Sequence, residues 1–395
     1  MTKENKKILV IHTRYQNFGG EDIAVENEVE LLKKRYLVKS VYFSNEVTRI
    51  SQLYSIVFGK SNRSKKIIQK EIDNFKPDYA IVHNSWFDAS LSIFHTLRQN
   101  NIKTFVKLHN YRNICASSFL VKNHLAKDSL ICQGCGFEKK NFQLFNKYYR
   151  DSYLKSFFII KFTKKLVYII KNFDISILVL SDFQKEKIKK MGVSPKKINV
   201  FENYLAPKNV KEAEFEKPFL LYAGRISKDK GIKELIETYS KCNLKNIDLK
   251  IIGNGPLLKE MQDLNHPKGV EFLGEVSNQK VKEYIKSSLG VITCTKTYEG
   301  QPTFLCEATM LSKLSIFPKT GAISDFFVDD YDFSFCQFDY EELKYKIIKL
   351  VNLSNTLGKK ELLEDQNHKY LVNKLDSNKL LDRLNQILKN SDKIK

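Results

Sequence analysis

The chain has 395 residues, of which 42% are hydrophobic and 28% are charged. This composition excludes a disordered chain, and the length favours two domains over a single core. No stretch of about 18 residues is apolar and free of charge, which argues against a membrane-spanning helix. The net charge of +21 is uneven: residues 1–200 carry 36 Lys and Arg against 17 Asp and Glu, and the remainder is nearly balanced. The first half is therefore expected to face an anionic partner.

Short apolar runs alternate with longer amphipathic stretches along the chain. The runs lie at 6–13, 36–43, 79–84, 104–110, 175–181 and 198–203, and then at 219–224, 249–255, 270–275, 289–294, 314–320 and 333–338. Continuous apolar runs are typical of parallel strands covered on both faces, and their alternation with helical stretches indicates βαβ units. The predicted fold class is α/β, with two doubly wound Rossmann-like domains facing each other across a cleft.

The domain boundary is placed in the polar stretch 202–218, which lacks a periodic apolar face and contains two prolines. The predicted domains are residues 1–206 and 207–375. A C-terminal helix at 376–395 is expected to pack back on the first domain.

In open α/β sheets, ligands bind beyond the carboxyl ends of the strands, where loops and helix N-termini gather. Gly19 and Gly20 follow the first run, and His109 follows the fourth, with Asn110 and Arg112 on the same loop. His109 is interpreted as functional on this ground. The alternative is a satisfied histidine at a strand end.

The segment "GRISKDKG" follows the first run of the second half and carries Arg225 and Lys230. Two cations beside a glycine-rich turn can clamp a diphosphate, although a solvated basic loop has the same composition. The next run ends in "GNGP", where Gly253 and Gly255 either let a ligand approach the backbone closely or simply form a tight turn.

The stretch "TYEGQPTFLCEAT" at 297–309 places two acids, Glu299 and Glu307, on either side of an expected helix start. Pro302 suits the first position of a helix, and the unpaired N–H groups at that end favour an anion. Carboxylates can accept hydrogen bonds from hydroxyls, so the pattern describes a site for a sugar, a diphosphate and a ribose. The alternative is that both acids are incidental.

These motifs carry a family resemblance. "EGQPTFLCE" resembles the E-x7-E element of the retaining nucleotide-sugar glycosyltransferases of family four, which have the GT-B fold. "GRISKDKG" and "GNGP" precede it in the expected order. In the first half, "FGGEDIAVENEVELL", "HNSWFDAS" and "LHNYRNIC" resemble the same family, and the whole set is similar to its bacterial surface-polysaccharide type.

The resemblance implies a role for each candidate residue and implies no cofactor and no divalent metal. Arg225 and Lys230 would hold the donor diphosphate in place of a metal ion. Glu299 would contact hydroxyls of the donor sugar, and His109 would lie beside the reacting sugar. The other donor-binding residues implied are Gly19, Gly20, Gly253, Gly255, Gly300, Gln301, Thr303 and Glu307.

A separate cluster contains Cys115, Cys132 and Cys135, in which "CQGC" is spaced like half of a zinc site and His124 is a candidate fourth ligand. The alternative is a set of buried or merely local thiols. Because the total of seven cysteines is odd, reduced thiols and a cytoplasmic location are expected.

Residues 138–173 interleave nine Lys and Arg and ten aromatic residues with two acids. Cations next to apolar aromatic side chains are what a segment at an anionic membrane surface needs. The alternative is an ordinary buried helix pair with a solvated basic face.

The function expected is a retaining, metal-independent glycosyltransferase, peripheral on the inner face of the cell membrane. Its second domain would bind a nucleotide sugar, with UDP favoured, and its first domain would bind a lipid-linked saccharide acceptor. One rival is a nucleotide-sugar epimerase of the same fold. Another is a basic nucleic-acid-binding protein, which would leave the acids and glycine turns of the second half without a purpose.

Overall fold

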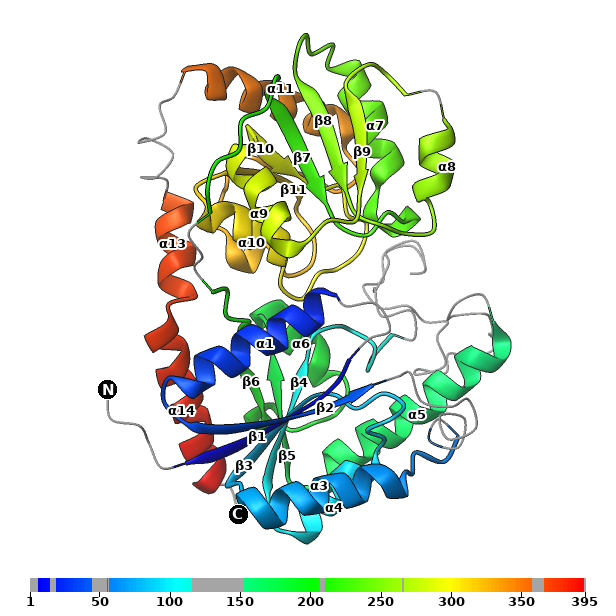
Figure 1. The fold of residues 1–395 in the computed structure, drawn as a ribbon, viewed down its shortest axis with the longest axis vertical. Helices are drawn as coiled ribbons and strands as arrows, with labels where there is room; N and C mark the ends of the chain where they lie inside the picture. Colours follow the sequence, from blue (N-terminus) through cyan, green and yellow to red (C-terminus); the bar gives the residue numbers. More distant parts are fainter. Residues whose placement is uncertain are drawn as a thin grey trace. The chain divides into compact units, whose positions relative to one another are not determined.

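The computed structural model describes residues 6–14, 19–44, 55, 57–115, 152–206, 210–264, 266–356 and 366–393. The chain forms two compact units, which can be followed by colour in Figure 1. Unit 1 comprises Met1–Leu205 and Leu375–Lys395, and unit 2 comprises Ala206–Lys374. Each unit is built on a six-stranded parallel sheet with flanking helices, so the predicted α/β fold class with two Rossmann-like domains is confirmed.

Unit 1 has the strand order β2-β1-β3-β4-β5-β6. Its strands are β1 (Lys7–Arg14), β2 (Leu37–Ser44), β3 (Tyr79–Asn84), β4 (Lys103–Leu108), β5 (Ile175–Val179) and β6 (Ile198–Val200). Its helices are α1 (Gly20–Lys33), α3 (Asn62–Phe75), α4 (Ser92–Gln99), α5 (Tyr153–Asn172), α6 (Asp182–Lys189) and α14 (Ser377–Lys393). Figure 1 shows α3 and α4 side by side and α14 running beside α1.

Unit 2 has the strand order β12-β11-β10-β7-β8-β9. Its strands are β7 (Phe219–Ala223), β8 (Asp248–Ile252), β9 (Val270–Gly274), β10 (Gly290–Ile292), β11 (Leu314–Pro318) and β12 (Ser334–Phe335). Its helices are α7 (Ile232–Lys241), α8 (Leu258–Asp263), α9 (Asn278–Ser287), α10 (Thr303–Met310), α11 (Tyr340–Thr356) and α13 (Gln366–Lys374).

The apolar runs of the sequence form the central strands because both faces of each sheet are covered. Every residue of β3, β5 and β11 is buried. The edge strand β2 instead alternates toward exposed positions, as expected where one side of the strand has no neighbour. Several helices begin at a serine whose hydroxyl accepts a backbone N–H of the first turn, namely Ser61, Ser152, Ser181 and Ser277.

The C-terminal helix α14 belongs to unit 1 and is held there by ion pairs as well as by its buried leucines. Asp382 pairs with Arg35 at 2.7 Å, and Arg383 pairs with Glu202. The hydroxyl of Tyr79 also donates to Asp392 at 2.7 Å. The chain therefore crosses between the units twice, near residues 205–206 and 374–375.

One glycine is needed for the loops after β7 and β10 to meet. Gly231 has φ of 69°, and a Cβ atom at this position would lie 2.3 Å from the carbonyl oxygen of Cys294. Gly274 has a nearly identical φ of 68° but open space around it. Substituting Gly274 therefore tests backbone strain alone, whereas substituting Gly231 tests backbone strain together with a steric clash.

We expect Gly274→Ala to lower the free energy of unfolding of unit 2 by about 1–2 kcal/mol, the usual cost of a left-handed L-residue. Gly231→Ala should cost roughly 2 kcal/mol more, because the loop carrying Lys230 must also move away from β10. Urea unfolding followed by circular dichroism compares the two variants. Equal shifts of the midpoint would show that the contact with Cys294 is not constraining.

Candidate functional site

The polar loops of unit 2 gather at the carboxyl ends of its central strands. β7 pairs with β8 on one side and with β10 on the other, so the crossovers diverge between β7 and β10. A crevice at such a topological switch point is the usual ligand site of an open α/β sheet. Arg225 and Lys230 follow β7, and Glu299 follows β10.

Lys230 and Glu299 are brought into direct contact at this point. The Lys230 ammonium forms a salt bridge with Oε1 of Glu299, which also accepts a hydrogen bond from Oγ1 of Thr295 at 3.3 Å. The side chains of Lys230 and Glu299 are 21% and 27% exposed, so a solute can reach both. Burial lowers the pKa of Lys230, but the carboxylates of Glu299 and Asp229 together outweigh it and raise this pKa above 10.5. The lysine is therefore a permanent cation.

Arg225 adds a second positive charge to the same loop. It is exposed, its positive charge acts against that of Lys230, and its carbonyl oxygen accepts a hydrogen bond from the Tyr222 hydroxyl at 3.0 Å. The two cations thus lie within electrostatic range of each other on a loop fixed at its base. This arrangement suits an anionic ligand with more than one charge.

Gly253 and Gly255 pack against the backbone of the loop after β7. Added Cβ atoms would lie 1.9 Å from the carbonyl oxygen of Gly224 and 2.2 Å from that of Ile226. The amide of Ile226 also donates to the carbonyl of Asn254 at 2.9 Å. The close packing of the two loops is therefore sufficient to require glycine at both positions. Contact of these glycines with a ligand stays a prediction.

The helix expected in the stretch 297–309 is present as α10 and begins at Thr303, one residue after Pro302. Gly300 and Gln301 are buried in the turn before it, where the amide of Thr303 donates to the carbonyl of Gln301 at 2.9 Å. The sequence thus predicted both the helix and the position of Glu299 just ahead of it.

Glu307 lies within α10 and is buried in an ion pair that the sequence analysis missed. Its Oε1 lies 3.3 Å from the ammonium of Lys282 on α9, and both side chains are less than one tenth exposed. The sequence feature that could have indicated this pair is the position of Lys282, three residues before the buried Ile285 on the apolar face of an amphipathic helix. Glu307 is therefore fixed by Lys282, and its contact with a ribose stays a prediction.

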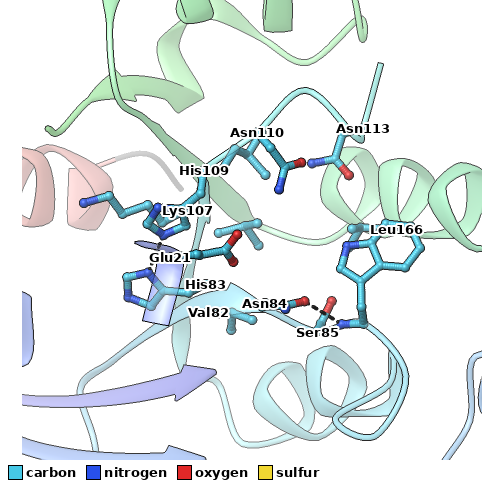
Figure 2. A pocket seen from close by; sticks show the side chains of 13 residues that line it. Glu21, Val82, His83, Asn84, Ser85, Lys107, His109, Asn110, Asn113 and Leu166 are labelled. Carbon is cyan, nitrogen blue, oxygen red and sulfur yellow. Dashed lines mark hydrogen bonds between the residues drawn. The ribbon is translucent and has the colours of Figure 1, made fainter. Parts of the chain in front are cut away.

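In unit 1, a pocket opens at the carboxyl ends of β3 and β4 (Figure 2). Figure 2 shows the rings of His83 and His109 together on one side of the pocket and Asn113 on the other. Its polar lining consists of Glu21, His83, Asn84, Ser85, Lys107, His109, Asn110 and Asn113, with the indole of Trp86 beside them. The pocket lies next to the switch point of this sheet, between β1 and β3.

His109 is hydrogen-bonded inside a cluster of ionisable side chains that the sequence did not reveal. Its Nε2 lies 2.8 Å from Nδ1 of His83, whose Nε2 lies 3.4 Å from Oε1 of Glu28. The other oxygen of Glu28 binds the ammonium of Lys107, which also donates to the carbonyl of Glu202 at 3.3 Å. The alternative interpretation of His109, a histidine whose ring is hydrogen-bonded within the protein, therefore applies to its Nε2 atom.

Gly19 and Gly20 stand at the start of α1. The amide of Gly19 donates to Oδ2 of Asp22 at 2.9 Å, and Oδ1 of the same carboxylate lies 2.9 Å from Nε2 of His12. A Cβ atom on Gly20 would meet nothing within 4 Å. The space beside Gly20 is thus open, which is compatible with the expected approach of a ligand to the backbone.

The candidate zinc cluster is only partly covered. Cys115 is buried, whereas Cys132, Cys135 and His124 lie outside the described residues. Within the described ranges no group of three or more His, Cys, Asp or Glu is arranged to hold a metal ion. Zinc binding by these four residues stays a prediction.

Helix α5 presents a mixed apolar and basic stripe to solvent, here called the α5 surface: Leu154, Phe157, Lys161, Lys164 and Tyr168. These positions are three or four residues apart and share one face of the helix. The exposed fractions of Leu154, Phe157 and Tyr168 are 66%, 51% and 64%. α5 contains five lysines and no acid. The rest of the predicted membrane segment, residues 138–151, lies outside the described residues.

Cations also gather around the α5 surface. Lys165 donates to the carbonyl oxygen of Phe58, which is itself 51% exposed, at 3.2 Å. Burial and the positive charges of Lys161 and Lys60 lower the pKa of Lys165. In the part of the chain that the structure covers, no helix combines the length and the apolar character needed to cross a bilayer.

Comparison with known protein families gives a match within the second unit. Residues 207–359 match the family model described as Glycosyl transferases group 1, so unit 2 contains a domain of this kind. No curated protein sequence matches the chain.

Solved structures with the same fold cover the whole chain. Sucrose-phosphate synthase from Thermosynechococcus elongatus superimposes with a TM-score of 0.70 at 12% identity, covering 99% of this chain and 100% of that one. Anabaena HepE in complex with UDP and glucose gives 0.68 at 12% identity, with 98% and 100% covered. The lipopolysaccharide outer core galactosyltransferase WaaB gives 0.61 at 16% identity, with 97% and 99% covered. The fold of the chain is therefore GT-B.

The buried histidines predict how the stability of unit 1 depends on pH. Burial, followed by neighbouring positive charges, holds the pKa values of His83 and His109 well below 6.5. In the unfolded chain both rings bind a proton as the pH falls through about 6.5, whereas the folded rings stay neutral. The unfolded state then binds more protons, so the free energy of unfolding should fall by up to about 1.4 kcal/mol per pH unit for each histidine.

Urea unfolding at a series of pH values from about 7 to about 5 measures this slope, with the fluorescence of Trp86 as a probe. Trp86 is the single tryptophan of the chain and is buried in unit 1, so it reports on that unit. His83→Gln should show a shallower slope than the parent protein. An unchanged slope would mean that His83 titrates normally in the folded state.

Proposed function

We propose that the protein is a retaining glycosyltransferase that moves a sugar from a nucleotide-sugar donor to a saccharide acceptor. The observation that carries this proposal is the contact between Lys230 and Glu299 at the switch point of a Glycosyl transferases group 1 domain. The Lys230 ammonium suits a phosphate, the Glu299 carboxylate suits sugar hydroxyls, and both are accessible. A nucleotide sugar presents these two chemistries side by side.

A UDP-sugar is the favoured donor. Anabaena HepE, which has the same fold, was solved with UDP-glucose and with UDP and glucose. In this chain Arg225 and Lys230 bind the diphosphate, Glu299 accepts hydrogen bonds from the sugar, and Glu307 is assigned to the ribose. Gly300, Gln301 and Thr303 line the path between sugar and phosphate.

The chemistry proposed needs positive charge where the UDP leaving group forms. Breaking the bond between the sugar and the phosphate places negative charge on the diphosphate, and fixed cations stabilise that charge in the transition state. Arg225 and Lys230 supply this stabilising positive charge without a divalent metal ion. The acceptor hydroxyl attacks from the face on which the phosphate departs, and a phosphate oxygen helps to remove its proton, which retains the anomeric configuration.

The acceptor proposed is a lipid-linked saccharide in the assembly of a bacterial surface polysaccharide, at the inner face of the cell membrane. Support comes from the α5 surface, where exposed Leu154, Phe157 and Tyr168 alternate with lysines and no acid is present on the helix. Apolar side chains and cations on one face are suited to an anionic leaflet. The concentration of positive charge in residues 1–200 agrees with this partner.

Replacing either member of the central ion pair should abolish transfer. We expect Lys230→Ala and Glu299→Ala each to lower kcat/KM by at least about 100-fold, because each removes a group that stabilises the transition state. Both side chains are partly exposed, so the fold should be retained. Lys296→Ala is the matched control, because Lys296 forms a comparable ion pair with Glu234 at 2.5 Å in the same region.

Release of UDP from a panel of UDP- and GDP-sugars measures this activity, after thermal stabilisation has selected the donor. Normal rates from Lys230→Ala or Glu299→Ala would refute the assigned roles. Conversion of the donor to another sugar nucleotide without any acceptor would identify an epimerase instead.

The α5 surface should bind anionic vesicles. We expect the protein to co-float with liposomes containing phosphatidylglycerol and not with pure phosphatidylcholine, with binding weakened by salt. Leu154→Ser combined with Phe157→Ser should reduce the bound fraction several-fold, since both apolar anchors are lost. Tyr345→Ser is the control, because Tyr345 on α11 of unit 2 is equally exposed, at 60%.

Equal flotation of the control and the double variant would place the membrane contact elsewhere. Salt-sensitive binding of DNA or RNA, without binding of anionic vesicles, would favour the nucleic-acid alternative.

A further inference from the structure

The family resemblance places His109 of unit 1 beside the reacting sugar, and the structure shows that His109 contacts a larger buried cluster. His12 on β1, Glu28 on α1, His83 on β3 and Lys107 on β4 are all at least nine-tenths buried. Each stands at or near the carboxyl end of its strand or on the helix that follows β1. Four ionisable side chains in one core are costly to bury, so their hydrogen bonds must be arranged in a definite way.

The contact between the two histidines restricts their protons. Nε2 of His109 and Nδ1 of His83 lie 2.8 Å apart, with the rings inclined by 26°. Two imidazole nitrogens form a hydrogen bond only when one carries the proton and the other offers a lone pair. Either His83 donates to His109, or His109 donates to His83.

Glu28 and Lys107 decide between these two arrangements. The Lys107 ammonium can only donate, and it binds one oxygen of Glu28. Burial raises the pKa of Glu28, but the positive charge of Lys107 opposes this, and the pair is taken as ammonium and carboxylate. The other oxygen of Glu28 lies 3.4 Å from Nε2 of His83, close enough for an electrostatic interaction although the two atoms form no hydrogen bond. A lone pair there would repel the carboxylate, whereas a proton is attracted to it. Nε2 of His83 therefore carries the proton, and its Nδ1 is the acceptor.

The surroundings keep both rings neutral. Burial comes first among the causes that lower the pKa values of His83 and His109 far below 6.5, and the positive charge of Lys107 adds to it. The charged and titratable groups around them are His12 from β1, Glu21, Asp22 and Glu28 from α1, Lys107 from β4 and Glu202 after β6. Both imidazoles thus have one N–H and one lone pair each.

Resting on the proposed function, we propose that His83 is a positioning residue that, with Glu28 and Lys107, holds His109 as the Nε2–H tautomer. This leaves the Nδ1 lone pair of His109 as the group offered to a sugar hydroxyl. Among the described residues no hydrogen bond to this Nδ1 is formed, and His109 lines the pocket of Figure 2. His109 then recognises the substrate as an acceptor of a hydrogen bond and not as a donor.

The tautomers are measurable without any activity assay. The full-length protein is labelled with 15N-histidine, and the ring nitrogens are recorded by long-range 1H–15N correlation at neutral pH. The seven histidines are assigned with single variants, including His83→Gln and His109→Gln. Neutral Nε2–H signatures for both His83 and His109 are expected. An Nδ1–H or a charged ring at His109 would overturn the proposal.

Kinetics separate positioning from a merely structural role. The amide oxygen of Gln can accept the N–H of His109, whereas Phe cannot, so His83→Gln should keep kcat within roughly 5-fold while His83→Phe lowers it by roughly 10- to 100-fold. The donor KM should change little in either variant. His95→Gln is the control, since His95 is exposed on α4 and outside the cluster.

Equal losses in His83→Gln and His83→Phe would overturn the positioning role. If the tautomers are as expected but the parent protein transfers no sugar from any donor, the proposed reaction fails and the tautomer assignment stands. If transfer occurs and His109 is the Nδ1–H form, this inference fails and the proposed function stands.

Discussion

The salt bridge between Lys230 and Glu299 exists because two separate loops leave neighbouring parallel strands at the same edge of a sheet. β7 delivers the lysine and β10 delivers the glutamate, and Gly231 lets the two loops approach without a side chain between them. The pair is partly buried, so Glu299 contributes to raising the pKa of Lys230. It is also partly exposed, so a ligand can reach both side chains. A ligand that carries both a phosphate and hydroxyls can replace each partner of the pair.

Both units are open parallel sheets with different strand orders, and they carry different polar chemistry at the carboxyl ends of their strands. In unit 2 the carboxyl ends of the central strands hold accessible charges of opposite sign. In unit 1 the corresponding region holds a buried cluster in which His83 links His109 to Glu28 and Lys107. Accessible charges suit the binding of an ionic ligand. A buried cluster is suited to fixing the orientation and proton of one side chain.

The sequence predicted the strands well because each is an apolar run bounded by polar residues, as in "YAIVHN" for β3 and "FLLYAG" for β7. It also placed Glu299 in a loop and α10 directly after it, since Pro302 and the glycine mark a helix start. Local signals of this kind lie within a few residues of the feature that they predict.

Pairings between distant residues were not predictable in the same way. Lys107 lies within an apolar strand and Lys282 on the apolar face of a helix, and neither position indicates in the sequence which acid is its partner. Only the fold brings Lys107 to Glu28, 79 positions earlier, and Lys282 to Glu307. In the sequence, His83 is likewise only a polar residue near the end of a strand. No neighbouring residue indicates that His109 is its hydrogen-bond partner.

A crystal structure of the full-length protein with a UDP-sugar tests the central claim most directly. The diphosphate should lie within hydrogen-bonding distance, about 3 Å, of Lys230 and Arg225, with sugar hydroxyls donating to Glu299. A nucleotide bound away from the loops after β7 and β10, with the salt bridge between Lys230 and Glu299 unchanged, would contradict the account.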